Sequence, residues 1–312
     1  SSPVDDRVRV RLAAAAIARA DSDANAASPT TASLLPRALA VLERVRDDLA
    51  GRLDACGPEE LRQFSRALQG RFVPPGPSGS PSRGRPDVLP TGRNFYGLDT
   101  RAVPTQTAWA LGVKSADLLL ETHLQKHGDY PRAIGLSVWG TATMRTGGDD
   151  IAQAFALLGV RPRWAAGSHR VVDVEVLPIV KLGRPRIDVT LRISGFFRDA
   201  FPNVVQLFDA AVRAVADQDD EDGDVNPVRA RILAERDALV AEGLDPVSAL
   251  DQAGWRVFGN AAGDYGTGLQ HLLHHGHWQD QADLAEAWIS ASAHAWSATR
   301  DGAPAGAVLR RR

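Results

Sequence analysis

Two apolar segments, each running into glycine and polar residues and then into a helix, constrain the fold more than any other feature. They span residues 133–139 and 187–193, and both have the length of a short buried strand. Periodic patterns predict helices over 105–125, 150–158 and 201–215, and a further strand over 171–179. Because buried strands that alternate with helices are typical of a parallel sheet with helices on its faces, we expect an α/β fold with a mostly parallel sheet and flanking helices.

Proline and glycine dominate residues 72–86 and exclude a helix or a central strand there, because proline lacks a donor and glycine loses the most entropy on ordering. The segment is either a domain linker or an ordered loop that lines a site. Helical patterns surround it, and they cover residues 8–20, 34–55, 58–68 (opened by Pro58), 226–242, 246–253 and 280–297. We therefore expect four parts: a helical segment at 1–70, an ordered Pro/Gly-rich loop at 71–105, an α/β domain at 106–216 and a mostly helical continuation of the α/β body at 225–312.

The composition excludes several classes of protein. The chain has 312 residues and a formal net charge of -2, so no global positive field favours nucleic acid or an anionic membrane. One cysteine excludes an internal disulfide framework, and no apolar run approaches the roughly 20 residues of a membrane span. The motifs of P-loop ATPases, dinucleotide-binding folds, serine hydrolases and zinc proteases are missing. We expect a cytoplasmic protein, and the abrupt ends suggest a piece of a longer chain.

The segment at 140–150 follows the first strand and precedes a helix, which is where open α/β sheets bind ligands. Arg145 can clamp a carboxylate, and Asp149 can act as a base or contact a metal. The alternative is that Asp149 or Asp150 only caps the helix.

A second group of charged residues surrounds the strand at 187–193. Arg184, Arg186 and Arg198 supply cations, and Asp188 and Asp199 supply anions. These residues either bind a ligand or pair with one another to orient the loops. In a parallel sheet, the segments that follow both strands fall at one edge.

A third group is rich in histidine. His271 and His275 are four residues apart, on one helix face, as two metal ligands would be. The alternative is a partly exposed helix end. The preceding turn, Gly263-Asp264-Tyr265-Gly266-Thr267-Gly268, can bring its backbone close to a ligand.

Together these segments resemble the large subunit of cobaltochelatase and, more distantly, the H subunit of magnesium chelatase. They include Arg93-Asn94-Phe95-Tyr96, Trp139-Gly140-Thr141 and Ser194-Gly195-Phe196-Phe197-Arg198-Asp199. The matching segments are 70–79, 83–86, 87–96, 99, 102–105, 139–141, 145–149, 159–162, 183–189, 194–199, 201–202 and 263–269. They follow one colinear order over about residues 58–299. Proteins of this family are several times longer, so the resemblance implies that the chain is an internal section.

The resemblance implies insertion of Co(II), a substrate metal, into the corrin hydrogenobyrinic acid a,c-diamide during aerobic cobalamin synthesis. ATP and Mg would be bound by AAA+ partner subunits, which agrees with the missing P-loop, and the section alone would be inactive. Asp149 stands where magnesium-type relatives carry Glu, so it is the first candidate for the base or metal contact, with His271 and His275 as further metal candidates. The candidate substrate-binding residues are Asn94, Asp99, Trp139, Thr141, Arg145, Arg184, Arg186, Arg198 and Asp199.

Two alternatives stay open. One is a magnesium chelatase component that acts on protoporphyrin IX. The other is a structural or docking section of a chelatase subunit that holds its substrate elsewhere.

Overall fold

The computed structural model describes residues 38–77, 81, 86–93 and 97–312. Contacts within the chain divide it into two compact units, one up to Gly97 and one from Leu98 onward. The helix expected over 8–20 lies outside the described residues. No helix in the described part of the chain has both the length and the apolar character to cross a membrane.

The first unit is built on one long helix, α3 (Ala50–Leu68), which a π-helical turn at Val45–Leu49 precedes. The sequence predicted a new helix at Pro58, but α3 runs through this proline, so that prediction is wrong. Contacts on either side of Pro58 explain the continuity. The hydroxyl of Thr91 donates to Glu60 at 2.5 Å, and the Thr91 N–H donates to Cys56 Sγ at 3.4 Å. Packing of this loop offsets the backbone hydrogen bond that proline cannot make.

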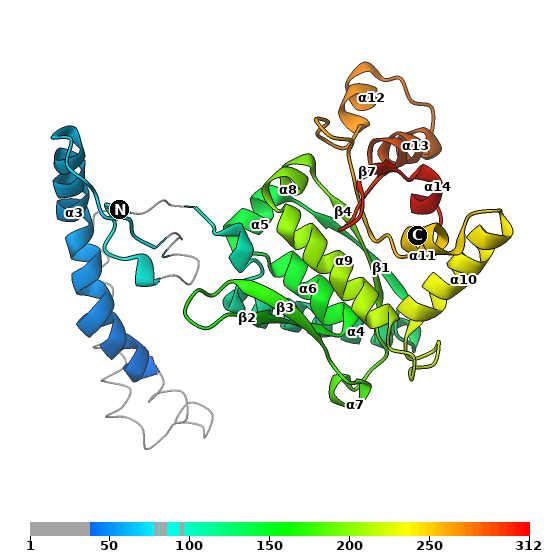
Figure 1. Cartoon of the computed structure of the whole chain (residues 1–312), viewed down its shortest axis with the longest axis horizontal. Helices are drawn as coiled ribbons and strands as arrows, with labels where there is room; N and C mark the ends of the chain where they lie inside the picture. The colour runs from blue at the N-terminus through cyan, green and yellow to red at the C-terminus, as the bar shows by residue number, and fades with distance from the viewer. Residues whose placement is uncertain (1–37, 78–80, 82–85, 94–96) are drawn as a thin grey trace. The chain divides into compact units, whose positions relative to one another are not determined.

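The second unit contains a five-stranded sheet in the order β1-β4-β5-β6-β7. Figure 1 labels its strands β1, β4 and β7. The strands are β1 (Ala133–Val138), β4 (Asp188–Ile193), β5 (Val257–Gly259), β6 (His294–Trp296) and β7 (Asp301–Pro304). The pairs β1–β4 and β4–β5 are parallel, whereas β5–β6 and β6–β7 are antiparallel. The expectation of an α/β body with a parallel central sheet and flanking helices is confirmed.

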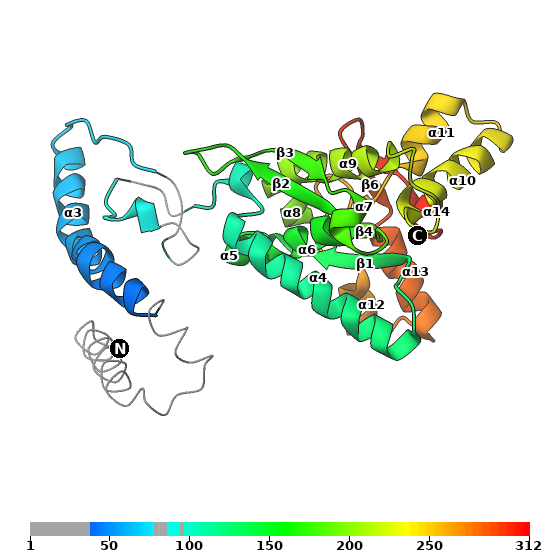
Figure 2. The ribbon, with the colours of Figure 1, turned by 90° about the horizontal axis from the view of Figure 1, so that it is seen from below.

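Alternate residues of β4 face two different layers. Val189, Leu191 and Ile193 are buried in the main core, which includes Phe155 and Phe208 from two of the helices. This layer contains α4 (Gln106–His127), α6 (Asp149–Leu158) and α9 (Pro202–Ala216), as Figure 2 shows. The other layer contains α13 (Gln281–Ala291) and α14 (Gly306–Leu309). α10 (Pro227–Ala241) packs against α9 and against α11 (Pro246–Ala253), and both helices add buried residues to the main core.

Several elements differ from the sequence expectations. The helix expected over 280–297 ends at Ala291, because Ser292 leaves the helical conformation and residues 294–296 pair with β5 and β7. The strand expected over 171–179 is β3 (Val171–Val176), which pairs with an unpredicted strand, β2 (Val160–Trp164), in a separate antiparallel ribbon. The segment 140–146, for which the sequence predicted no helix, is a short helix, α5. Another short helix, α7 (Ile179–Leu182), follows β3.

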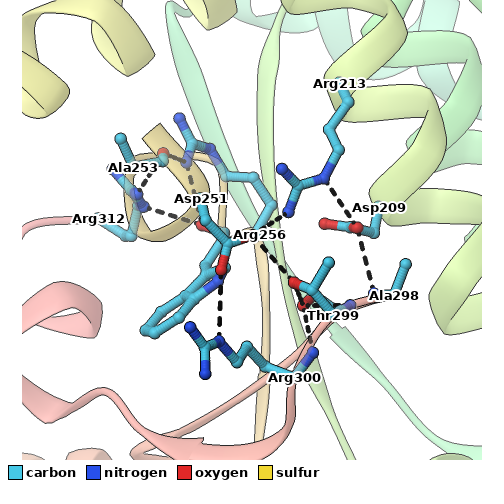
Figure 3. A network of polar contacts seen from close by, with 11 residues as sticks. Asp209, Arg213, Asp251, Ala253, Arg256, Ala298, Thr299, Arg300 and Arg312 are labelled. Carbon is cyan, nitrogen blue, oxygen red and sulfur yellow. Dashed lines mark hydrogen bonds and ion pairs between the residues drawn. The ribbon is translucent and has the colours of Figure 1, made fainter. Parts of the chain in front are cut away.

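A polar network ties α9 and α11 to the turn after β6 (Figure 3). Arg213 bridges two carboxylates, with Nε 3.0 Å from Asp209 and Nη2 2.8 Å from Asp251. Asp251 also accepts a hydrogen bond from the Thr299 hydroxyl at 2.9 Å, and Asp209 accepts one from the Ala298 N–H at 3.2 Å. Because both carboxylates are largely removed from water, these charge-assisted bonds fix the spacing of the helices at this end of the unit.

Candidate functional site

The ends of β1 and β4 are joined directly. The backbone N–H of Gly140 donates to Ser194 Oγ at 3.1 Å, and the Ser194 N–H donates to the Val138 carbonyl at 3.0 Å. Ser194 Oγ also accepts the N–H of Phe197 at 3.2 Å, so Ser194 is the N-cap of α8 (Gly195–Ala200). The sequence prediction that both strand-end segments lie at one edge of the sheet is confirmed.

Two glycines permit three strand-end segments to meet at this edge. A Cβ on Gly140 would lie 2.5 Å from the Phe196 ring, and a Cβ on Gly195 would lie 2.6 Å from the carbonyl oxygen of Asp264 and from the Tyr265 ring. Asp264 and Tyr265 belong to the turn that follows β5. The segments after β1, β4 and β5 therefore form one surface, which we name the carboxyl edge.

Arg198 holds this surface together from beneath. Its side chain is buried, and Nη1 donates to the carbonyls of Ala261 and Asp264 at 2.5 and 3.2 Å. Its Nε lies 2.6 Å from Asp199, which also accepts the Tyr265 hydroxyl at 2.8 Å. The hydrogen bond from Arg198 lowers the pKa of Asp199 although burial opposes it, and the same carboxylate raises the pKa of Tyr265.

Large aromatic side chains are exposed around this charged group. The exposed fraction is 42% for Trp139, 40% for Phe196 and 64% for Tyr265. Nearby, the Oδ1 of Asn260 is buried and accepts no hydrogen bond from the part of the chain that the structure describes. Exposed rings next to buried polar groups are typical of a site that binds a largely apolar ligand with a few polar substituents.

Arg192 is a residue of this region that the sequence analysis missed. Its guanidinium lies between two indoles, 5.6 Å from the ring centre of Trp139 and 5.9 Å from that of Trp288. It donates to Ser292 Oγ at 3.0 Å and to the Gly266 carbonyl at 2.7 Å. The signal in the sequence was a charged residue between two apolar ones, Leu191 and Ile193, in a strand expected to be buried.

Thr141, Arg145 and Asp149 all follow β1. Thr141 and Arg145 are exposed on α5, and Arg145 forms no ion pair with any described residue. Asp149 is the first residue of α6, after the N-cap Gly148, and its Oδ1 accepts the Asp150 N–H at 2.9 Å. Burial and the neighbouring Asp149 raise the pKa of Asp150, while Arg145 opposes that rise. Asp149 thus gives a hydrogen-bond acceptor to one of the backbone N–H groups at the start of α6. Its second carboxylate oxygen stays available to a ligand.

Arg184 and Arg186 lie at the other end of the sheet, before β4 begins. Arg184 donates to the carbonyls of Ala156 and Leu157 at the end of α6, at 2.6 and 3.2 Å. Arg186 is fully buried, pairs with Glu221 at 2.6 Å and donates to backbone carbonyls. The structure therefore does not bring them to the carboxyl edge, and their partners match the alternative of internal pairing.

Asp99 and Asn94 are the two remaining substrate-binding candidates from the sequence. The carboxylate of Asp99 accepts from Arg101 at 3.1 Å and from Arg170 at 3.0 Å. Burial would raise the pKa of Asp99, but these hydrogen bonds hold it below its ordinary value. Asn94 lies outside the described residues.

His271 and His275 lie on α12 (Leu269–His275), and His277 follows this helix. The ring of His275 lies 5.1 Å from that of His274 and 5.8 Å from that of His277. Among the described side chains, no group of three or more His, Cys, Asp or Glu gathers as metal ligands would.

Comparisons with known proteins agree on one family. The family model of CobN/magnesium chelatase matches residues 4–312. The chain is 58% identical over 265 residues to the aerobic cobaltochelatase subunit CobN of Pseudomonas aeruginosa, which covers 85% of this chain and 21% of that protein. It is 36% identical over 276 residues to the H subunit of the magnesium chelatase of Rhodobacter capsulatus, covering 88% of this chain and 22% of that protein.

The comparison with solved structures agrees with this family. The catalytic subunit of cobaltochelatase from Mycobacterium tuberculosis matches with a TM-score of 0.67 and 47% identity, over 94% of this chain and 24% of that one. The chain thus spans about a fifth of the length of the curated relatives it matches.

Proposed function

The chain belongs to the CobN/magnesium chelatase family, and from this premise we propose that it is a section of a cobaltochelatase subunit whose carboxyl edge contacts the tetrapyrrole substrate. The whole subunit would insert Co(II) into hydrogenobyrinic acid a,c-diamide. Identity of 58% to a cobaltochelatase subunit, against 36% to a magnesium-chelatase subunit, supports cobalt over magnesium.

The observation that carries the proposal is the exposed aromatic group at the carboxyl edge. Trp139, Phe196 and Tyr265 present apolar rings to solvent, although the core of the same unit is well packed. A tetrapyrrole offers a broad apolar face for such rings and peripheral carboxylates for cations. Arg145 is an exposed cation at the same edge with no described ion-pair partner, so it can hold a ring carboxylate without losing an internal bond.

Metal insertion requires that the ring lose N–H protons and that the Co(II) ion lose water. We assign the proton or metal contact to Asp149, since a carboxylate can accept a proton or bind a metal through oxygen. Arg198 and Asp199 hold the turn with Tyr265 in place, so they position the binding surface from beneath. Thr141 contributes shape and polarity beside the ring. The AAA+ partner subunits would supply ATP hydrolysis, in keeping with the lack of a P-loop in this sequence.

Titration with the corrin tests the site. Trp139 and Trp278 have nearly equal exposed fractions, 42% and 41%, but Trp278 lies between α12 and α13. We expect Trp139→Ala to weaken the binding of hydrogenobyrinic acid a,c-diamide at least about fivefold, because stacking on an aromatic ring contributes about 1–3 kcal/mol. Trp278→Ala should leave the affinity within about twofold. Equal affinities for both variants would favour a structural or docking role for this section.

A parallel titration with protoporphyrin IX separates the two metal chelatase classes. Tighter binding of the corrin supports the cobalt assignment, and tighter binding of the porphyrin contradicts it. For the chemistry, Asp149→Asn in the complete subunit with its partners should reduce turnover at least about tenfold without the same loss of corrin affinity. Normal turnover would remove Asp149 from the mechanism.

A further inference from the structure

A groove lies on the face of the sheet that α6 and α9 do not cover. Its floor consists of the outward residues of β1, namely Ala133, Gly135 and Ser137, all of which are exposed. Trp288 of α13 and Leu309 of α14 line it from the side, together with Arg312, whose guanidinium pairs with Glu235. The groove has a volume of about 280 Å³. Small floor residues leave room for a flat ligand, but by themselves they do not indicate one.

Arg192 provides the independent sign of a ligand, because it is a buried cation that lines the same groove. The residue is only 4% exposed, and it forms no ion pair with any residue in the described ranges. Its Nε and Nη2 donate to Ser292 Oγ and the Gly266 carbonyl, whereas Nη1 has no hydrogen-bond partner among described residues. The parallel register places Ser137 directly beside Arg192 on the neighbouring strand.

A buried cation without a counter-ion is costly. Other buried arginines of this unit have carboxylate partners: Arg186 pairs with Glu221, and Arg256 lies 2.6 Å from Asp188. Burial lowers the pKa of Arg192, with no carboxylate to oppose it. Cation–π contacts and two hydrogen bonds to neutral groups offset only part of the free-energy cost of removing the guanidinium from water. An anion at Nη1 would supply the missing charge.

We propose that this groove is a carboxylate-binding subsite, in which Arg192 Nη1 and the Ser137 hydroxyl donate to a carboxylate carried on a small or flat apolar body. The carboxylate can belong to the edge of the tetrapyrrole or to a separate small acid. The first source rests on the proposed function, since Trp139 contacts both Arg192 and the carboxyl edge. The second source does not.

The first test introduces the anion as a side chain of the protein itself. Ser137→Asp places a carboxylate beside Arg192, and Ser137→Asn is the neutral control of the same shape. Neither substitution removes a bond that Arg192 makes, whereas Arg192→Gln would lose two and disturb the fold. We expect Ser137→Asp to raise Tm above that of Ser137→Asn, because it neutralises the buried charge. A Tm equal to or below that of Ser137→Asn would contradict the proposal.

Benzoate and benzamide then probe the free groove, since they share a ring and differ in charge. Benzoate should bind the wild type and Ser137→Asn, benzamide should bind at least about tenfold more weakly, and Ser137→Asp should lose at least about tenfold in benzoate affinity. Arg163→Gln, which removes an exposed cation on β2, should leave benzoate binding unchanged. Equal binding of benzoate and benzamide, or unchanged benzoate affinity in Ser137→Asp, would overturn the proposal.

Titration with hydrogenobyrinic acid a,c-diamide identifies the source of the carboxylate. A tenfold weaker affinity in Ser137→Asp than in Ser137→Asn assigns the subsite to the ring. Equal corrin affinities together with charge-dependent benzoate binding assign it to a separate acid. If the wild type binds no corrin, the proposed function fails while the benzoate result still decides the subsite. If benzoate also fails, both are overturned.

Discussion

Ser194 Oγ accepts the backbone N–H of Gly140 at 3.1 Å, which joins the ends of two parallel strands whose residues are 54 positions apart in the chain. The same oxygen accepts the backbone N–H of Phe197 in the first turn of α8. One buried hydroxyl therefore fixes the relative position of the segments that carry Trp139 and Arg198.

Ser194→Ala should lower the free energy of unfolding by about 1–3 kcal/mol, because it removes a helix cap and leaves the Gly140 N–H unsatisfied. Urea denaturation measures the change. Ser168→Ala is the control, since Ser168 Oγ accepts only a 3.4 Å bond from the Arg170 N–H in an exposed turn, and it should cost less than about 0.5 kcal/mol. Equal costs would mean that the Ser194 hydroxyl does not join the strand ends.

Gly195→Ala should displace the turn with Tyr265, because the new Cβ would lie 2.6 Å from a backbone oxygen. We expect a loss of about 1–3 kcal/mol in stability from overpacking and a fall in corrin affinity of about tenfold. Gly51→Ala on α3 has open space around it and should be neutral or slightly stabilising. Unchanged corrin affinity in folded Gly195→Ala would separate this turn from the binding surface.

Arg186→Gln should destabilise the chain by about 3–5 kcal/mol, because it leaves Glu221 without its buried partner. The double variant Arg186→Met with Glu221→Met should recover much of this loss, since both charges are then absent. Arg163→Gln, which removes an exposed cation, should change stability by less than about 0.5 kcal/mol. If folded Arg186→Gln loses corrin affinity without losing stability, the arginine contacts substrate after all.

Asp99 should contribute to acid unfolding. Its pKa is lowered in the folded chain, so the native carboxylate stays charged where the unfolded one, with a value near 3.8, takes up a proton. Its contribution is therefore complete above that value and is lost as pH falls through the folded pKa. Asp99→Asn should cost about 1–2 kcal/mol at pH 7 and flatten the loss of stability below about pH 4. Urea midpoints across pH 2–7, with the exposed Asp237→Asn as control, check this, and parallel curves for wild type and Asp99→Asn would contradict it.

The sequence predicted the alternating architecture because apolar strands and amphipathic helices have distinct periods. It predicted the meeting of the strand ends because parallel strands share one edge. It missed the continuity of α3 through Pro58, since contacts from Thr91 on a distant loop stabilise the helix there. It also missed β6, because a three-residue strand has too few residues to show a period.

The positions of the candidate site residues were likewise predicted only in part. Trp139, Thr141, Arg145 and Asp149 follow β1 directly, so chain order alone placed them at the edge. The arginines at 184 and 186 precede β4, and their carbonyl and carboxylate partners come from α6 and from residue 221, which local sequence cannot reveal. The sequence did not predict the surroundings of Arg192, because its neighbours Trp139 and Trp288 come from segments far apart in the chain.

A crystal structure of the chain soaked with hydrogenobyrinic acid a,c-diamide tests the central claim most directly. We predict that the corrin lies in van der Waals contact with Trp139 and Tyr265, at the carboxyl ends of β1, β4 and β5. A corrin bound elsewhere on the chain, with both aromatic rings still open to solvent, would contradict it.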